Sequence, residues 1–592
     1  MAWKTNKLHK RFAESEIGTI RKDRRGRIKV ALVYPHRYYV GMSNLGFLTV
    51  YFLLNEIEHV VCERAFLSTE GAAEDKGQAP DRITTVESGQ PISDFDIIAF
   101  SVSFENDYPN LLTILEKAGL PLLSKERENS HPLVIAGGVT CFLNPEPIAP
   151  FIDCFLIGEA EELLPRFFSV LCEMGLEKGF KTDEEKEACL RSVARHVPGA
   201  YVPAFYKDSH NADGILCSFE PVGEVPNKIE RVYVKDLSRV STCSSVITPN
   251  TAFGRTFLIE VARGCPHGCR FCSTGYIYRP PRFRPLSLLE KCIEQGSSLT
   301  KKIGLVGTAV SDLPEIQKLG EYGVQRGNSI SFSSFRANSL TPELISVLRQ
   351  SKVKTAAIAP DAGSERMRKV INKGITEEDI LHAAEALVEG GILNLKLYFM
   401  IGLPTETMDD VEAVAKLCKQ IKKVFLKKSR PQKRIGKITV SINSFVPKPV
   451  TPFQWVAMEE ARTLKVKVKK IKDGLKRVAN VRVIANSQRW AYIQALFSRG
   501  DRKVAQILTL AHKNGGNWAK TFKESSLDSD LYIHRERSPD ELLPWDFIDH
   551  GINKLFLAKE YQRAIQGKTS PPCPMESCDI CGVCQKDSSP KG

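Results

Sequence analysis

The chain has 592 residues, of which 42% are hydrophobic and 26% charged, and its formal net charge is +14. This composition supports a buried core and excludes a wholly disordered protein, and the length suggests about four folding units. The basic N-terminus has no apolar run behind it, which argues against a secretory signal. The most apolar early segment, 40–54, is too short and too interrupted to span a bilayer. We therefore expect a soluble, cytoplasmic protein with no membrane partner.

Residues 28–175, behind a basic tail at 1–27, alternate between short apolar runs and longer amphipathic stretches. This alternation predicts strands followed by helices. It indicates an open, doubly wound α/β (Rossmann-like) sheet, whose ligands bind at the carboxyl ends of the strands. The expected strands are 27–35, 59–66, 96–104, 132–138 and the start of 153–171, and the expected helices are 43–58, 106–119 and the end of 153–171.

A connector at 176–245 leads to a second alternating region at 246–455. Helical stretches such as 341–350, 376–391 and 407–423 separate its apolar runs, which predicts a parallel sheet with crossover helices. The six expected strands are 256–262, 302–307, 329–335, 355–361, 395–402 and 437–445.

Residues 456–545 are predicted to form a basic, mostly helical region, followed by a Cys-rich segment at 546–592. Part of the helical region mixes aromatic residues with arginines. This mixture is typical of a helix core, and stacking on nucleic-acid bases is the alternative. The residues are Trp490, Tyr492, Phe497, Arg499 and Arg502.

The excess positive charge is concentrated in two runs. Residues 422–437 carry eight cations and no acid, and residues 464–477 carry seven cations and one Asp, so that the two runs together equal the whole net charge. Such runs favour a polyanionic partner such as RNA. A solvated face on two surface helices explains them equally well.

Sixteen cysteines in a long cytosolic chain argue against a disulfide framework. Nine are scattered singly and are expected to act as small buried hydrophobic residues. Three of the others, Cys265, Cys269 and Cys272, have the spacing C-x3-C-x2-C behind an apolar strand. Zinc in a structural site takes a fourth protein ligand, whereas a cubane iron–sulfur cluster on three cysteines leaves one iron open. The spacing therefore indicates a catalytic iron–sulfur centre.

This loop resembles the cluster loop of the radical SAM superfamily, in which an aromatic residue precedes the last cysteine, as Phe271 does here. The resemblance implies a 4Fe-4S cluster on Cys265, Cys269 and Cys272 whose open iron chelates S-adenosylmethionine. Reductive cleavage of that cofactor then yields methionine and a 5′-deoxyadenosyl radical. The resemblance also implies that residues 246–455 form a partial (β/α)6 barrel with the reactive centre at the strand carboxyl ends.

The resemblance implies cofactor contacts after the second and fourth strands. Gly307 begins the stretch where relatives often have a Gly-Gly-Glu for the methionine amine, but no Glu follows it here. Asp361, Ser364 and Arg366 are similar in position to polar residues that contact the ribose or the methionine moiety. Ser364 also suits the N-cap of a helix, which is the alternative interpretation.

After the fifth strand, Gly402 and Glu406 in IGLPTET resemble the family motif that lies near the adenine. Glycine allows another group to approach the backbone closely, although an ordinary loop turn explains Gly402 equally well. The sequence singles out no catalytic residue beyond these cofactor contacts.

The second group of cysteines is Cys573, Cys578, Cys581 and Cys584, with four, two and two residues between them. This compact run resembles ferredoxin-type spacing more than a zinc ribbon, whose halves are farther apart. We expect an auxiliary 4Fe-4S cluster, with zinc as the alternative. A fully ligated cluster would relay electrons, whereas one missing a ligand could bind substrate or donate sulfur.

Residues 137–147 and 153–162 resemble parts of the cobalamin-binding domain that precedes many radical SAM modules. Such domains carry Asp-x-His-x-x-Gly after the first strand. Here His36 is present, but Tyr34 replaces the Asp and Tyr39 the Gly. Without a carboxylate to orient it, His36 would be a weaker cobalt ligand. Cobalamin binding and a vestigial or repurposed domain both remain open.

We therefore predict a radical SAM enzyme that cleaves S-adenosylmethionine with electrons from a reductant such as flavodoxin or ferredoxin. One hypothesis is methylation or methylthiolation of RNA, with the basic runs holding phosphates. Another is chemistry on a small metabolite or peptide. A third is a non-catalytic iron–sulfur electron-transfer or RNA-binding protein. The sequence leaves the substrate and the oligomeric state open.

Overall fold

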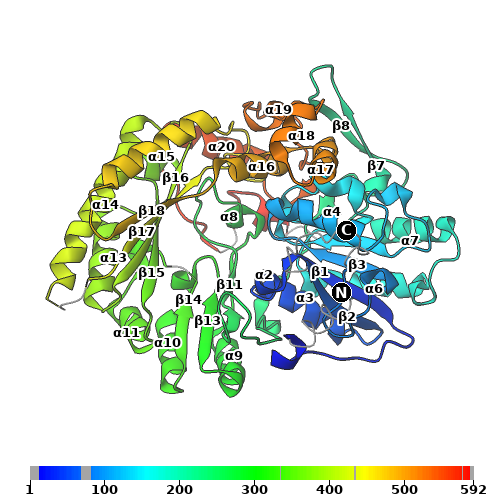
Figure 1. The fold of residues 1–592 in the computed structure, drawn as a ribbon, viewed down its shortest axis with the longest axis horizontal. Coiled ribbons are helices and arrows are strands. Elements are labelled where there is room, and N and C mark those ends of the chain that lie inside the picture. Colours follow the sequence, from blue (N-terminus) through cyan, green and yellow to red (C-terminus); the bar gives the residue numbers. More distant parts are fainter. Residues whose placement is uncertain (1–11, 68–81, 334, 432–434, 576–577, 587–592) are drawn as a thin grey trace, which may run out of the picture.

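The computed structural model describes residues 12–67, 82–333, 335–431, 435–575 and 578–586 (Figure 1). Within these residues, none of the helices combines the length and apolar character that crossing a membrane requires.

The N-terminal sheet has the strand order β2-β1-β3-β4-β5-β6, parallel except for β6, and helices cover it. The strand β1, which has a neighbour on each side, is buried along most of its length, which explains why it appears in the sequence as a continuous apolar run. The predicted doubly wound sheet is confirmed. Its strands are β1 (Ile28–Arg37), β2 (Val60–Leu67), β3 (Ile97–Ser101), β4 (Leu133–Gly137), β5 (Cys154–Leu156) and β6 (Ala200–Tyr201), and its helices are α2 (Tyr38–Gly41), α3 (Leu45–Glu56), α4 (Tyr108–Lys117), α5 (Val139–Leu143), α6 (Ala160–Glu173) and α7 (Asp183–His196).

The connector contributes short strands that tie distant parts of the chain together. β7 (Tyr206–His210) and β8 (Leu216–Pro221) form a hairpin, and β9 (Ile229–Glu230) pairs with β19 (Ile548–Asp549) near the C-terminus.

The barrel strands fall into two parallel sheets. β10 (Phe257–Glu260), β13 (Lys302–Val306) and β14 (Ser329–Phe332) form the first, and β15 (Thr355–Asp361), β16 (Asn394–Ile401), β17 (Ile438–Ser444) and β18 (Val481–Ala485) form the second. A parallel bridge between Phe335 and Ile358 joins them. All six predicted strands are present.

β18 is a correction, because it lies inside the region 456–545 predicted as helical. It extends the second sheet in parallel to β17. Its five residues alternate between exposed and half-buried, as expected of an edge strand. A short alternating run between two helical stretches gives only a weak sequence signal.

Helices connect the barrel strands and run back along the outside of the sheet, as Figure 1 shows for α13 and α14. Thr376 and Thr407 each begin a helix with a capping box, formed with Asp379 and Asp410. The helices are α9 (Leu286–Leu299), α10 (Ile316–Gln325), α11 (Pro342–Gln350), α12 (Glu365–Val370), α13 (Glu377–Glu389), α14 (Met408–Ser429) and α15 (Ala461–Leu475).

The C-terminal helices lie across both halves of the molecule (Figure 1). Phe497 and Arg499 are fully buried, and the ring of Phe497 packs 5.3 Å from that of Tyr108 in α4, as the helix-core interpretation predicts. Trp490, in contrast, is half exposed. The helices are α16 (Gln488–Arg499), α17 (Val504–Lys513), α18 (Trp518–Glu524), α19 (Asp530–Ile533), α20 (Lys554–Ile565) and α21 (Val583–Lys586).

Candidate functional site

The three-cysteine loop follows β10 and the short strand β11 (Ala262–Arg263), and it ends in helix α8 (Thr274–Ile277). Its entry depends on Gly264, which has φ +87°. A Cβ atom there would lie 2.6 Å from the Tyr278 carbonyl oxygen, so only glycine fits this turn. Cys269 is buried, whereas Cys265 and Cys272 are partly exposed. The loop thus presents its thiols at the carboxyl end of the first barrel strand.

The thiols of the loop lie close enough to influence one another. The pKa of Cys265 is raised to about 12, chiefly by burial. A backbone hydrogen bond from His267 opposes this rise, and the neighbouring Cys269 and Cys272 add to it. Burial also raises the pKa of Cys269, while Lys373 and Arg336 lower it. Thiolates at this buried place need cationic partners. Lys373 and Arg336 are two such partners, and iron would be another if a cluster is bound.

The donor set fits a cubane cluster. Three soft thiolates suit iron–sulfur chemistry, and they would leave one iron for another ligand. Among the described residues, no three His, Cys, Asp or Glu side chains converge closely enough to hold a single metal ion. A cubane places each thiolate on a different iron, so its ligands stand farther apart than those of one ion.

Lys373 and Arg336, which the sequence interpretation missed, place positive charge beside Cys269. The Lys373 Nζ donates to Asp361 Oδ2 at 2.5 Å, and the Arg336 Nη2 donates to the Lys373 carbonyl at 2.9 Å. Asp361 has φ +61°, a left-handed backbone that non-glycine residues seldom adopt. Asp361 therefore positions a largely buried lysine next to the cysteine loop. Only the tertiary contact, not a motif, reveals this role.

A second charged pair involves a residue of the loop itself. His267 Nε2 pairs with Asp312, and Asp312 also acts electrostatically on Cys265. Asp312 follows the stretch that begins at Gly307 and lacks the expected Glu. Gly307 itself exchanges two hydrogen bonds with Ser333, at 2.9 and 3.3 Å, which join the ends of β13 and β14. The structure thus places a carboxylate near the cluster loop after all.

Ser364 and Arg366 both hydrogen-bond to other residues of the chain. Ser364 is the N-cap of α12, accepts from the Met367 N–H at 3.1 Å and donates to Asp410 Oδ1 at 2.6 Å. Arg366 pairs with Asp410 and donates to the Thr405 carbonyl at 2.7 Å. Burial raises the pKa of Asp410, but hydrogen bonds from Arg366, Ser364 and Thr407 lower it to about 2. A cofactor role for Ser364 and Arg366 stays a prediction.

Gly402 and Glu406 form a closed turn after β16. Gly402 has φ +78°, and its N–H donates to Glu406 Oε2 at 2.8 Å. Lys467 Nζ lies 2.9 Å from the same oxygen and 2.7 Å from Glu459 Oε1. Burial raises the pKa of Glu406 above its ordinary value, and Lys467 only partly offsets this rise. Phe271 packs against the apolar cluster beneath this turn. The predicted contacts of these residues with the cofactor remain predictions.

A cavity of about 610 Å³ lies where the two sheets present their carboxyl ends to each other. On the barrel side it is lined by Glu260, Gly307 and Ser333, and on the N-terminal side by Ser101 and Gly137. It extends between the N-terminal sheet and helices α3 and α6, where the lining is apolar, as at Leu32, Leu54, Leu164 and Phe168. The cavity therefore connects the barrel edge with the interior of the other domain.

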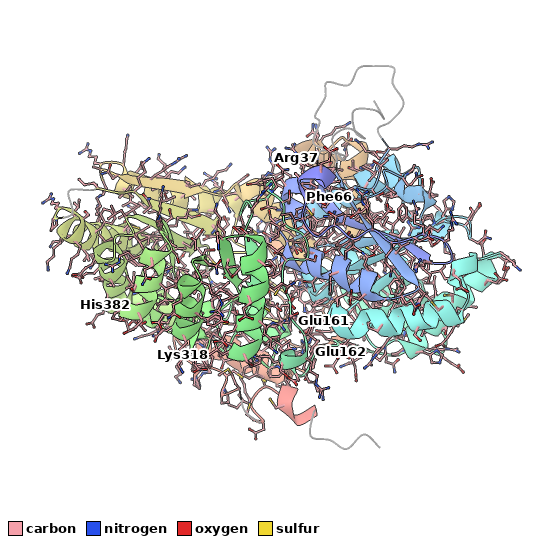
Figure 2. The ribbon with its side chains drawn as sticks, turned by 90° about the horizontal axis from the view of Figure 1, so that it is seen from below. Arg37, Phe66, Glu161, Glu162, Lys318 and His382 are labelled. Atoms are coloured by element: carbon pink, nitrogen blue, oxygen red, sulfur yellow. The ribbon has the colours of Figure 1, made fainter. Side chains whose placement is uncertain are left out.

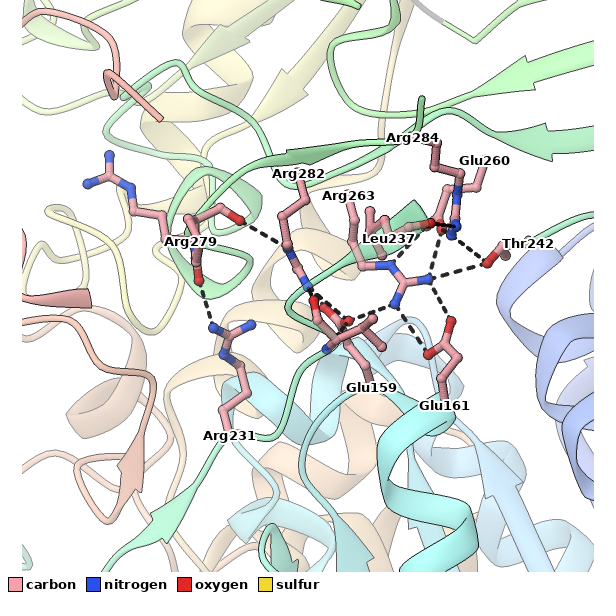
Figure 3. A network of polar contacts seen from close by, with 12 residues as sticks. Glu159, Glu161, Arg231, Leu237, Thr242, Glu260, Arg263, Arg279, Arg282 and Arg284 are labelled. Carbon is pink, nitrogen blue, oxygen red and sulfur yellow. Dashed lines mark hydrogen bonds and ion pairs between the residues drawn. The ribbon is translucent and has the colours of Figure 1, made fainter. Parts of the chain in front are cut away.

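Ion pairs at the wall of this cavity join the two domains (Figure 3). Arg263, directly before the cysteine loop, lies 2.8 Å from oxygens of Glu159, Glu161 and Glu260. Arg282 lies 2.7 Å from Glu159. Burial raises the pKa of Glu159, but Arg263 and Arg282 lower it to about 2. Figure 2 shows Glu161 at the seam between the barrel and α6. The cluster loop is thus held to the N-terminal domain electrostatically.

His36 lies outside this cavity. It is half-buried, its Nδ1 accepts the Arg37 N–H at 2.8 Å, and burial together with Arg37 lowers its pKa. Arg37 lies well away from Glu161 in Figure 2. The expected Asp position is taken by Tyr34, which packs edge-on against Phe47 at 5.6 Å. A ligand in the cavity would not be coordinated by His36.

Two family models match the chain: "Radical SAM proteins, N-terminal" over residues 46–203, and "Radical SAM superfamily" over 259–418, which includes all three loop cysteines. The uncharacterized protein MJ0966 of Methanocaldococcus jannaschii is 30% identical, across 86% of this chain and 96% of that one. The chain belongs to the radical SAM superfamily. The predicted family, fold class and radical SAM enzyme activity are therefore confirmed.

More distant relatives and structural neighbours carry named activities. A tRNA-2-methylthio-N(6)-dimethylallyladenosine synthase of Chloroherpeton thalassium is 25% identical over 30% of this chain and 42% of that one. Among solved structures, the radical S-adenosylmethionine methyltransferase TsrM of Kitasatospora setae, with cobalamin and a 4Fe-4S cluster bound, has a TM-score of 0.43 at 13% identity. That match covers 70% of this radical SAM chain and 72% of TsrM.

Proposed function

We propose that this radical SAM enzyme acts on a small, largely apolar substrate held in the cavity between its two domains. The observation that carries the proposal is that one cavity touches the carboxyl ends of both sheets and contains Gly307 and Ser333 of the barrel edge. A cluster on Cys265, Cys269 and Cys272 would supply one electron and an open iron for S-adenosylmethionine, and cleavage of that cofactor gives a 5′-deoxyadenosyl radical.

The side chains around the loop suit this chemistry. Lys373 and Arg336 offset the negative charge of thiolates, and Asp361 holds Lys373 in place. Asp312, beside Cys265, is the carboxylate that we assign to the ammonium group of S-adenosylmethionine. Because these charged side chains are already in position before the cofactor binds, they need little reorganisation when it does.

The cavity walls favour a neutral substrate. The charged side chains that line it, Glu159, Glu161, Glu260 and Arg263, are all paired with one another or with Arg282 and Arg284. A ligand pocket with mostly apolar walls and few polar groups selects by shape and by isolated hydrogen bonds. Apolar walls also exclude water, which protects a radical from side reactions.

A cobalamin ligated by His36 does not fit this arrangement, because His36 does not line the cavity and its Nδ1 already accepts a backbone hydrogen bond. We therefore assign no step to cobalamin.

RNA is the second candidate substrate, favoured by the similarity to the tRNA methylthio-synthase and by the two basic runs. The fold sets the first run far from the cavity. Helix α14 starts at the carboxyl edge of the sheet and its 22 residues, about 33 Å long, carry 422–429 to the opposite edge. Residues 432–434 of that run lie outside the described residues.

Several cations of the runs also have internal partners. Lys428 lies 3.0 Å from Glu385, Lys470 lies 2.8 Å from Glu412, and Lys467 is bound to Glu406. Figure 1 shows α14 and α15 on the outer side of the barrel, whereas α8 lies at its centre. These positions support the small substrate over RNA.

The test uses anaerobically reconstituted full-length protein with S-adenosylmethionine and dithionite. We expect a small-molecule extract to increase 5′-deoxyadenosine formation and to yield a new product by mass spectrometry, whereas total RNA does neither. The variant K423Q/K427Q is the matched control and should behave like wild type. Stimulation by RNA that this variant weakens, with a reduced salt dependence, would favour the RNA substrate instead.

A further inference from the structure

We propose that Cys573, Cys578, Cys581 and Cys584 hold a second iron–sulfur cluster that delivers electrons to the cluster on the loop at Cys265–Cys272. The four cysteines lie beyond both family matches, which end at residue 418. The inference concerns how the enzyme is reduced, and it is independent of the substrate that occupies the interdomain cavity.

The C-terminal segment is bound directly to the three-cysteine loop. The Cys573 N–H donates to the Pro266 carbonyl at 2.7 Å. Asn372 connects the two segments a second time, because its Nδ2 donates to the Gly268 carbonyl at 3.1 Å and its Oδ1 accepts the Ser570 N–H at 2.8 Å. The two segments that carry the cysteine groups are therefore hydrogen-bonded to each other, both directly and through Asn372.

Arg270 makes the strongest of these connections. Its side chain is buried inside the loop, between Cys269 and Cys272, and its Nη2 donates to the Lys568 carbonyl at 2.8 Å. The guanidinium also pairs with Glu560 of α20 at 3.1 Å. Glu560 in turn accepts from the Ser570 hydroxyl at 2.7 Å. A buried ion pair with satisfied hydrogen bonds fixes the register between the loop and the C-terminal segment.

The C-terminal thiols lie near one another. The Cys578 N–H donates to the Cys584 thiol. Cys573, Cys578 and Cys581 line a cavity of about 220 Å³. Four thiolates in a ferredoxin-type run suit a cubane with no open iron, and hydrogen bonds to sulfur tune the potential of such a cluster.

The same cavity is shared with the first cysteine loop. Gly268 and Tyr276 line it, together with Arg279, whose buried guanidinium hydrogen-bonds the Cys581 thiol. Arg279 also stacks against Tyr276 at 5.1 Å. The arginine places a fixed positive charge between the two cysteine groups, where it offsets the charge of a thiolate-bound cluster.

The C-terminal group is accessible from solvent beside Cys578. Met575 and Ile580, on either side of that cysteine, are 46% and 59% exposed. A protein reductant can therefore approach this group, and the shared cavity and the hydrogen bond from Cys573 to Pro266 place the loop next to it. Electron transfer falls steeply with distance, so two neighbouring cysteine groups suit transfer of an electron between their clusters.

The redox step would balance with one external electron donor. A low-potential protein of the flavodoxin or ferredoxin class would give one electron to the cluster held by the C-terminal cysteines. That electron would then pass to the cluster held by Cys265, Cys269 and Cys272, which would leave the C-terminal cluster oxidised again. Transfer of the electron to S-adenosylmethionine would break its sulfur–C5′ bond and give methionine and a 5′-deoxyadenosyl radical.

The first measurement is metal content. Anaerobically reconstituted wild type should contain about eight irons per chain, and C578A about four. The triple variant C265A/C269A/C272A should also retain about four irons, with an electron paramagnetic resonance signal of a reduced cubane. C217A, which removes the exposed thiol of β8, is the matched control and should retain the wild-type content. Zinc in place of iron, or no loss in C578A, would overturn the proposal.

The second measurement compares two electron sources. With flavodoxin and its reductase, C578A should form 5′-deoxyadenosine about tenfold or more slowly than wild type, because the relay cluster is lost. With the small reductant titanium(III) citrate, which reaches the loop cluster without the relay, the variant should match wild type. If C578A forms 5′-deoxyadenosine equally slowly with both reductants, or at the wild-type rate with both, the relay role is contradicted. Because cleavage is measured without substrate, failure here is distinguishable from failure of the small-substrate proposal.

Discussion

The two sheets that face each other across the central cavity have similar architecture but different chemistry at their carboxyl edges. The barrel edge carries thiols, Asp312 and the largely buried Lys373–Asp361 pair. Apart from Glu159 and Glu161, which pair with arginines, the N-terminal edge carries small side chains such as Ser101, Gly137 and Ala160. The difference indicates that the barrel supplies the reactive groups, whereas the N-terminal domain shapes the space in which they act.

Figure 3 shows where these two edges are joined. Glu159 and Glu161 of the N-terminal domain pair with Arg263 and Arg282 of the barrel segment, so that charges of both domains compensate each other. Substitutions on the two edges and at their junction should therefore have different effects.

The largest effect is expected at the barrel edge. Replacing Cys269 with Ala removes a ligand of the loop cluster, so about four irons per chain should be lost. Formation of 5′-deoxyadenosine should fall to the level of protein without iron, as measured by chromatography. C418A, which removes a buried thiol of α14 outside both cysteine groups, is the control. Persistent cleavage in C269A would contradict the assignment of the reactive edge.

At the junction, Glu159→Gln should destabilise the protein by about 3–5 kcal/mol, because it removes the carboxylate that pairs with the buried Arg282 and one of the three carboxylates around Arg263. The loss is measured as a lower thermal unfolding temperature. Glu162→Gln, one turn away on the exposed face of α6, should change stability by less than about 1 kcal/mol. Similar melting of both variants would show that the junction contributes little.

The junction also predicts a pH dependence. The folded protein lowers the pKa of Glu159 to about 2 from an ordinary value of 4.5. A lowered carboxyl pKa stabilises the folded state above pH 4.5, and this contribution is lost as the pH falls toward 2. The loss should be about 3 kcal/mol. In E159Q that part of the acid sensitivity should be missing, as seen in melting curves recorded across this range.

On the N-terminal edge, Ala160→Phe should fill part of the cavity without touching the cysteines. We expect product formation to fall by about 10²-fold, because a displaced substrate loses its reactive geometry. Iron content and cleavage without substrate should remain at wild-type levels. The control on the same helix is S169F, because the Ser169 side chain is exposed to solvent. An unchanged product yield in A160F would contradict the cavity assignment.

The smallest effect is expected at His36→Ala. The side chain is half-buried and makes a local hydrogen bond to Arg37, so stability should change by about 1 kcal/mol or less. Activity should be retained. Cobalt in purified wild type that disappears from H36A would instead assign His36 to a cobalamin.

Much of the fold followed from local patterns. Thr376 and Thr407 indicated helix starts, and the apolar runs of β13, β15 and β16 indicated buried parallel strands. β18 was missed because its five residues alternate weakly at the sheet edge. The cysteine loop was identified because thiol spacing is a local property of the chain.

The roles of Lys373 and Arg336 could not be predicted, since neither belongs to a motif and each acts through partners distant in sequence. The same holds for the link between Pro266 and Cys573, which are some 300 residues apart.

By itself, the sequence determined the family, the seven clustered thiols and the alternating α/β architecture, because these depend on short-range spacing and periodicity. It also located the excess charge in two runs. The tertiary structure alone decided that the two cysteine groups are neighbours, that the basic run of α14 leads away from the cavity, and that His36 lies outside it. Contacts between distant segments depend on how the elements pack, and packing brings together groups whose separation along the chain carries no signal.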